Sequence, residues 1–160
     1  MLFRHLLLSC SLLLWNCQES VSSASNEKYY AATFAKVNWF QAQSACQRSN
    51  MMLASVTSLQ RHLQVIRSIS LNGHLLGHEK FWLGGNNLGD LSTWNWMSRG
   101  LPFGYKKWAK DEPRSALTGQ EGCLAMGLDE DWHSEDCNNE YYFVCERQCN
   151  SSATFEPLYI

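Results

Sequence analysis

The order of hydrophobic and polar residues predicts two helices in the first half of the chain. The first begins at Asn38-Trp39-Phe40-Gln41, which has the pattern of a capping box, and we expect it to run from Trp39 to about Ser49. The second begins at Thr57-Ser58-Leu59-Gln60 and is expected to end at Asn72-Gly73. Its hydrophobic residues recur at helical spacing, which predicts one buried and one polar face. The buried face comprises Leu59, Leu63, Ile66 and Ile69, and the polar face Arg61, His62, Gln64 and Arg67.

Short runs of aromatic and β-branched residues predict strands at the start and in the second half of the chain. Between them, Ser98–Gln120 shows little regular pattern over 23 residues. That is long for a loop in a compact domain, so this segment is either a functional loop or one whose elements the pattern hides. Helices followed by short strands indicate an α+β domain. The expected strands are Lys28–Tyr30 with Ala32–Val37 (one strand or two), Phe81–Gly85, Thr93–Met97 and Tyr141–Cys145.

Length and composition are those of one domain with a short appendage. The chain has 160 residues and a net charge of −2, from 13 basic and 15 acidic residues. This balance gives no support for a nucleic-acid binder or a polybasic membrane-surface protein. Seven Trp and 12% aromatic residues argue against a disordered chain.

The first 24 residues have the three parts of a secretory signal peptide. Arg4 and His5 form a basic start, Leu6–Trp15 is an apolar run, and Ser20–Ala24 is a stretch of small residues. The apolar run is too short to span a bilayer, although an uncleaved membrane anchor is the alternative. We expect cleavage near Ala24, or after Ser22, and a soluble, secreted product.

Five of the seven cysteines lie outside this segment: Cys46, Cys123, Cys137, Cys145 and Cys149. No pair has the Cys-x-x-Cys spacing of a zinc knuckle, and no nearby pair of histidines completes a zinc finger. In a secreted chain these cysteines therefore indicate disulfide bonds with one thiol left over.

From Lys28 to Glu146 the chain resembles the C-type lectin-like domain family, and in particular the small secreted single-domain lectins of insects. The first helix with Cys46 and the core strand Trp82-Leu83-Gly84 carry the resemblance. The other matching positions, in the family's order and spacing, are Trp94, Trp96, Trp108, Glu112-Pro113, Cys123, Trp132, Cys137 and Phe143-Val144-Cys145-Glu146.

The resemblance implies a fold with two helices, small antiparallel sheets, paired end strands and a long recognition loop. It also implies the disulfide bonds Cys46–Cys145 and Cys123–Cys137. In the chain-entropy model a bridge that closes about 100 residues contributes up to ~4.7 kcal/mol, and one that closes about 14 residues nearer ~3 kcal/mol. The expected organisation is a signal peptide over 1–24, a lectin-like domain over 25–147 and a polar tail over 148–160.

In this family a calcium ion usually holds the sugar, and the resemblance places its side-chain ligands in three segments. Here these segments are Glu112-Pro113-Arg114, Glu121 and Trp132-His133-Ser134, where the family has Glu-Pro-Asn, Glu and Trp-Asn-Asp. Calcium takes six to eight oxygen ligands. Only two of the five side-chain ligands, Glu112 and Glu121, remain.

Arg114 is the decisive departure from the family pattern. A guanidinium group about 4 Å from a divalent cation is repelled by roughly 4 kcal/mol per unit-charge pair at an effective dielectric constant of 20. The same side chain is suited to lie between Glu112 and Glu121 as a salt bridge in place of the ion. We therefore predict no high-affinity calcium at the sugar site, and no other cofactor.

Two charged segments leave alternatives open. Five carboxylates between Asp129 and Asp136 form either a metal site in another register or a solvated acidic surface. A basic stretch in the long loop either recognises an acidic glycan or protein, or is ordinary surface, with Trp108 in the core. Its residues are Arg99, Lys106, Lys107, Lys110 and Arg114, with Tyr105 and Trp108 between them.

Other chemistry finds little support in the sequence. His74 and His78 share a helical spacing, but the glycines at 73 and 77 disfavour a helix there, and a third metal ligand is lacking nearby. Motifs for nucleophilic, metalloprotease or phosphate chemistry do not occur, so an enzyme is not expected. Asn150-Ser151-Ser152 is a glycosylation sequon, and the unpaired Cys149 predicts a disulfide-linked homodimer.

Two classes of function remain. The first is a secreted lectin that binds glycans on cell, microbial or matrix surfaces through Glu112, Arg114, Glu121, His133, Ser134, Lys106 and Lys107. The second is an extracellular protein-binding or structural module that has lost sugar binding. Fold resemblance supports the first by analogy.

Overall fold

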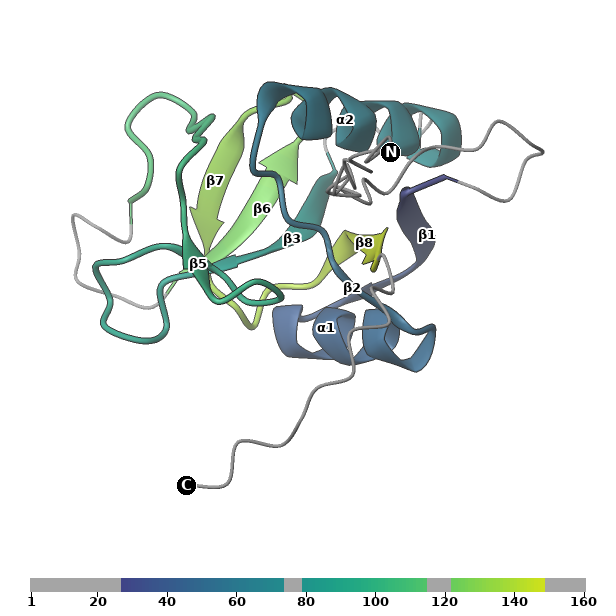
Figure 1. Cartoon of the computed structure of the whole chain (residues 1–160), viewed down its shortest axis with the longest axis horizontal. Helices are drawn as coiled ribbons and strands as arrows, with labels where there is room; N and C mark the ends of the chain where they lie inside the picture. Colours follow the sequence, from purple (N-terminus) through teal and green to yellow (C-terminus); the bar gives the residue numbers. More distant parts are fainter. Residues whose placement is uncertain (1–26, 74–78, 115–121, 149–160) are drawn as a thin grey trace, which may run out of the picture.

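The computed structural model describes residues 27–73, 79–114 and 122–148, and it has the α+β architecture that the sequence predicts (Figure 1). One helix lies on each side of a mixed sheet. The elements in chain order are β1 (Tyr29–Val37), α1 (Trp39–Arg48), β2 (Met51–Leu53), α2 (Leu59–Gly73), β3 (Lys80–Asn86), β4 (Asn95–Trp96), β5 (Leu101–Pro102), β6 (Cys123–Gly127), β7 (Trp132–Glu135) and β8 (Tyr141–Arg147).

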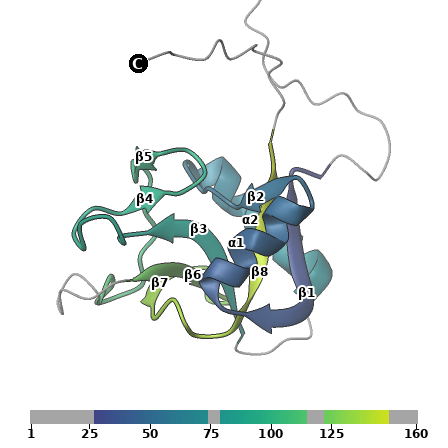
Figure 2. The same ribbon diagram turned by 90° about the horizontal axis from the view of Figure 1, so that it is seen from below.

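The sheet brings the two ends of the domain together, as predicted. β1 pairs antiparallel with β8, with Tyr29 opposite Glu146, and the two strands run side by side (Figure 2). β3 pairs parallel with β8 and antiparallel with β4 and β6. β6 and β7 form a hairpin beyond β3, so the region that carries the predicted sugar site extends from the side of β3 away from β1.

Alternate residues of the central strands supply two separate hydrophobic cores, because successive side chains of a strand point to opposite faces. Phe81 and Leu83 of β3 pack with Val65 of α2, whereas Trp82 of β3 packs with Trp39 of α1. Each helix therefore covers one face of the sheet.

The first helix agrees closely with its prediction. The Asn38 side chain accepts a hydrogen bond from Gln41 N, and the Gln41 side chain accepts one from Asn38 N, which completes the capping box. Trp39, Ala42 and Cys46 are buried. The helix ends at Arg48, one residue before the expected end.

The predicted buried face of α2 is wrong in part. Leu59 and Leu63 are 58% and 56% exposed, whereas His62, from the predicted polar face, is 2% exposed. The reason lies in the contact with β1: the Ser68 hydroxyl accepts a hydrogen bond from Ala31 N and donates one to Tyr29 O. This anchor turns Val65 and Ile69 toward the sheet and leaves Leu63 in solvent.

Several strands differ from the prediction. Residues 29–37 form one strand, and the run expected over 93–97 is a strand only at Asn95–Trp96. The pattern did not indicate β2, β5, β6 or β7. β2 and β5 are three and two residues long, too short for a periodic signal, and β6 is buried at every position, so it lacks alternation.

Both disulfide bonds that the resemblance implies are present. Cys46–Cys145 joins α1 to β8 across 99 residues, and Cys123–Cys137 joins β6 to the segment after β7 across 14 residues. Among the described residues, none of the helices is long and apolar enough to cross a membrane.

Candidate functional site

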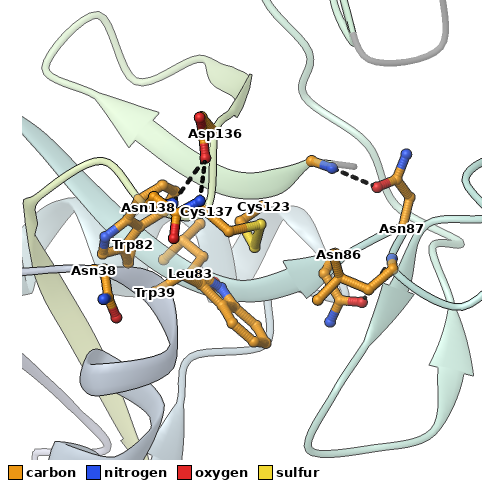
Figure 3. Close-up of a disulfide and its surroundings, with 12 residues drawn as sticks. Asn38, Trp39, Trp82, Leu83, Asn86, Asn87, Cys123, Asp136, Cys137 and Asn138 are labelled. Carbon is orange, nitrogen blue, oxygen red and sulfur yellow. Dashed lines mark hydrogen bonds between the residues drawn. A yellow bond between two sulfur atoms is a disulfide. The ribbon is translucent and has the colours of Figure 1, made fainter. Parts of the chain in front are cut away.

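The Cys123–Cys137 disulfide fastens the base of the candidate site to α1 and β3 (Figure 3). Trp39 N donates a hydrogen bond to Cys137 O at 3.0 Å, and Trp39 Nε1 donates one to Leu83 O at 2.9 Å. On the other side of the bridge, Gly122 N donates to Asn87 Oδ1 at 2.6 Å. The β6–β7 hairpin is thus held at both of its open ends.

A cluster of aromatic rings packs the long loop against the core. Trp96 and Phe103 stack with ring centroids 4.2 Å apart, and Trp108 meets Trp94 edge to face at 4.8 Å. Trp108 also contacts Trp132, which is fully buried. Trp108 is thus partly buried against the core, as the core interpretation expects.

The loop backbone runs beside β7 and brings the first and third predicted ligand segments together. Trp132 N donates to Lys107 O at 2.8 Å, and Ala109 N donates to Trp132 O at 2.9 Å. Because the chain is paired with β7 up to this point, Glu112 arrives next to Ser134.

Glu112 is the centre of the site. Its side chain is 4% exposed and accepts four hydrogen bonds. The donors are Arg114 N (2.8 Å), Arg114 Nε (2.9 Å), Ser134 N (3.1 Å) and Ser134 Oγ (2.7 Å). Burial alone would raise the pKa of Glu112, but these hydrogen bonds and the Arg114 charge outweigh it, so the pKa lies below its ordinary value and the group is a carboxylate.

Arg114 bridges two carboxylates of the described residues, Glu112 and Glu135. Its Nε lies 2.9 Å from Glu112 Oε1, and its NH2 lies 3.6 Å from Glu135 Oε1. The predicted partner, Glu121, lies outside the described residues. The Arg114 side chain is nevertheless 62% exposed, so part of its guanidinium group faces solvent.

Glu135 belongs to a second group of polar contacts that the sequence did not indicate. Lys80 Nζ forms an ion pair with Glu135 Oε1, and the Tyr141 hydroxyl donates to Glu135 Oε2 at 3.2 Å. Burial and the Glu135 charge raise the pKa of Tyr141 to about 12. The available signal was the alternation of β7, in which His133 and Glu135 are the partly exposed residues and therefore share one face of the strand.

His133 lies between two carboxylates at the edge of the site. Its Nδ1 is 3.7 Å from Glu112 Oε1, and its Nε2 is 3.2 Å from Asp129 Oδ2. Imidazole, guanidinium and hydroxyl groups thus surround Glu112, where the family pattern has oxygen ligands of calcium.

The acidic segment Asp129–Asp136 does not converge on one point. Asp129 faces His133, Asp131 pairs with Lys107, and Asp136 accepts two hydrogen bonds from Asn138. Within residues 27–73, 79–114 and 122–148, no group of three or more His, Cys, Asp or Glu could hold a metal ion.

The basic stretch also separates into parts. Lys106 is exposed, Lys107 pairs with Asp131, and Arg99 lies away from both, with its NH2 2.7 Å from Glu146 Oε1. The expectation that Arg99 joins the loop lysines is therefore wrong, because the turn after β4 directs it toward the end of β8. Five other residues named in the predictions, Glu121, Cys149, Asn150, His74 and His78, lie outside the described residues.

Comparison with known proteins identifies the family. The family model for the lectin C-type domain matches residues 35–147, so this chain belongs to the C-type lectin domain family. C-type lectin mosGCTL-7 of Culex quinquefasciatus is 28% identical over 121 residues, which cover 70% of this chain and 69% of the relative.

Solved structures share the fold. The cow carbohydrate-recognition domain of CD23, solved in the presence of a GlcNAc2Man3 oligosaccharide, is 26% identical with a TM-score of 0.63, over 76% of this chain and 87% of that one. A calcium-independent type II antifreeze protein has a TM-score of 0.59 at 23% identity, over 73% and 82% of the two chains, and shows the fold alone.

Proposed function

We propose that this protein is a secreted lectin that binds glycans through the long-loop site without the family's usual calcium ion. The observation that carries the proposal is the Arg114 guanidinium group bound to Glu112 at 2.9 Å, where the family pattern has a calcium ligand. Glu112, Arg114, His133 and Ser134 form the centre of the proposed site, and Lys106, Lys107 and Glu121 are its other proposed ligand-binding residues. Family membership supports carbohydrate as the ligand class.

The residues around Glu112 do not fit a calcium ion. Both carboxylate oxygens already accept hydrogen bonds from Arg114, and Ser134 donates two more. A divalent cation near Glu112 would have to displace a guanidinium group that repels it by roughly 4 kcal/mol per unit-charge pair at about 4 Å. His133 replaces a neutral amide oxygen with a nitrogen, which hard cations such as calcium disfavour.

The exposed part of Arg114 suits an acidic or hydroxyl-rich ligand. Guanidinium groups bind carboxylate and sulfate by paired hydrogen bonds, and the exposed Lys106 adds a second cation. Glu112 and Glu135 already hold the Arg114 side chain in position. Binding a ligand therefore costs little further loss of Arg114 side-chain entropy.

A glycan array run with calcium and again with chelator tests this function. We expect the same glycans to bind in both conditions, and Arg114→Gln to lose most of the signal. Arg67→Gln, an equal charge change on the exposed side of α2, is the matched control and should bind as the wild type. Binding that chelator abolishes, or a micromolar calcium titration signal that Glu112→Ala removes, would contradict the proposal.

A protein-binding or structural extracellular module is the alternative. A calcium-independent type II antifreeze protein has the same fold. The loss of a calcium-dependent sugar site is therefore compatible with another function for this fold. Binding of no glycan in either condition would favour this alternative.

The proposal also includes secretion, glycosylation and dimer formation. We propose cleavage of the signal peptide near Ala24, glycosylation of Asn150 in the tail and a disulfide-linked homodimer through Cys149. The two domain disulfides support an oxidising compartment. A non-reducing gel of the secreted protein should show a dimer that Cys149→Ser converts to monomer. A monomeric wild type with a thiol that labels at Cys149 would refute the dimer.

A further inference from the structure

Glu146 is a buried carboxylate that contacts three cations. It lies at the opposite end of β8 from the long-loop site. Its side chain is 2% exposed, and its Oε1 lies 3.5 Å from Lys28 Nζ, 2.8 Å from Arg61 NH1 and 2.7 Å from Arg99 NH2. Its other oxygen accepts a hydrogen bond from Ser55 N at 2.9 Å. The three cations come from the start of β1, the first turns of α2 and the turn after β4.

The cluster carries more positive charge than Glu146 neutralises. Three cations against one carboxylate leave an excess of two charges, and Glu146 is the only carboxylate of the described residues within 4 Å of any of them. Arg99 Nε is in addition buried without a hydrogen-bond partner. Burial lowers the pKa of Lys28, Glu146 raises it, and the charges of Arg61 and Arg99 lower it further.

All three cations also reach the surface. The side chains of Lys28, Arg61 and Arg99 are 32%, 25% and 28% exposed. The molecule therefore presents a compact group of three partly exposed cations at its surface.

We infer that Lys28, Arg61 and Arg99 form a second binding site, distinct from the long-loop site, for the sulfate groups of a sulfated polysaccharide. The buried Glu146 holds the three cations in one place, so an incoming sulfate meets fixed donors. Guanidinium groups match the oxygen geometry of sulfate, and the lysine adds a point charge. A compact cluster suits a discrete anionic group better than the long row of contacts that a nucleic-acid backbone requires.

Heparin is the probe for this site. We expect the full-length secreted protein to bind immobilised heparin at about 0.15 M salt and to elute as salt rises, because screening weakens exposed charge contacts. Lys28→Gln should weaken binding by about threefold and Arg99→Gln by about tenfold. Lys36→Gln is the matched control: Lys36 is an exposed lysine paired only with Glu79 among the described residues, and its loss should change binding less than twofold.

A measurement on the wild-type protein tests the inference even if the variants fail to fold. Acetylation of the wild type, read by mass spectrometry, should show that heparin protects Lys28 while Lys36 and Lys110 react as before. Failure to bind heparin, equal losses in Lys28→Gln and Lys36→Gln, or unprotected Lys28 would each overturn the inference. Tighter binding to duplex DNA of matched charge would also overturn it. Heparin should still protect Lys28 from acetylation in Arg114→Gln, whereas the loss of glycan-array signal in that variant tests the long-loop site, so the two tests fail independently.

Discussion

Replacing Glu146 with glutamine tests how much the buried ion-pair network stabilises the domain. The substitution keeps the side-chain shape and an oxygen that accepts from Ser55 N, but it removes the negative charge. Lys28, Arg61 and Arg99 then converge on a neutral group. Because these cations come from β1, α2 and the turn after β4, the change weakens the contacts of three segments with the end of β8.

The magnitude follows from burial and exposure. Removing one partner of a fully buried ion pair costs about 3–5 kcal/mol, because the other charge is left without compensation. Here the cations are 25–32% exposed and regain part of their hydration, which reduces the cost. We expect Glu146→Gln to lower the free energy of unfolding by about 2–3 kcal/mol, which lowers the Tm of a domain of this size by about 8–12 °C.

Chemical denaturation of the oxidised protein measures this difference, with both disulfides confirmed by mass spectrometry. Glu79→Gln is the matched control, since among the described residues Glu79 pairs only with the exposed Lys36, and exposed pairs contribute about 0–1 kcal/mol. A Glu146→Gln variant within 0.5 kcal/mol of that control would refute the view that the network holds these segments together.

Three further predictions concern the pH dependence of stability and the packing of the core. The pKa of Glu112 lies below its ordinary value of 4.5, so the stability that this carboxylate contributes is present above pH 4.5. That contribution is lost as the pH falls through the lowered pKa. Between about pH 3 and 6, the free energy of unfolding should therefore fall less in Glu112→Gln than in the wild type. Leu63→Gln should change stability by less than about 0.5 kcal/mol and Val65→Ala should cost about 1–2 kcal/mol, and the reverse order would mean that α2 is rotated. Gly84→Ala should cost about 1–3 kcal/mol, because a Cβ there would lie 2.8 Å from Leu53 O; an unchanged denaturation midpoint would refute this close approach.

Local sequence signals were most reliable where one short segment contains all the interacting groups. The capping box of α1 lies within Asn38–Gln41, so its two reciprocal hydrogen bonds could be predicted from four letters. The ordered motifs of the family were informative for a different reason: the resemblance implied the bridges Cys46–Cys145 and Cys123–Cys137, although their cysteines are 99 and 14 residues apart.

Predictions that depended on the orientation of an element were less reliable. Hydrophobicity alone placed Leu63 inside α2 and His62 outside, but Ser68 anchors this helix to β1 and sets its rotation. In the candidate site, the sequence indicated Arg114 as a partner of Glu112 and Glu121. The contact of Arg114 with Glu135 arises only because β7 runs beside the loop.

The amino-acid sequence by itself determined the family, the α+β class, the first helix and the departure from the calcium pattern, because each depends on residue types at short or characteristic spacings. Only the tertiary structure decided which face of α2 is buried, that Glu135 also contacts Arg114 and which cations gather around Glu146. These contacts join residues 21 to 118 positions apart, and no local pattern records them. Their geometry follows from the pairing of β1, β3, β7 and β8 and from the packing of the helices on that sheet.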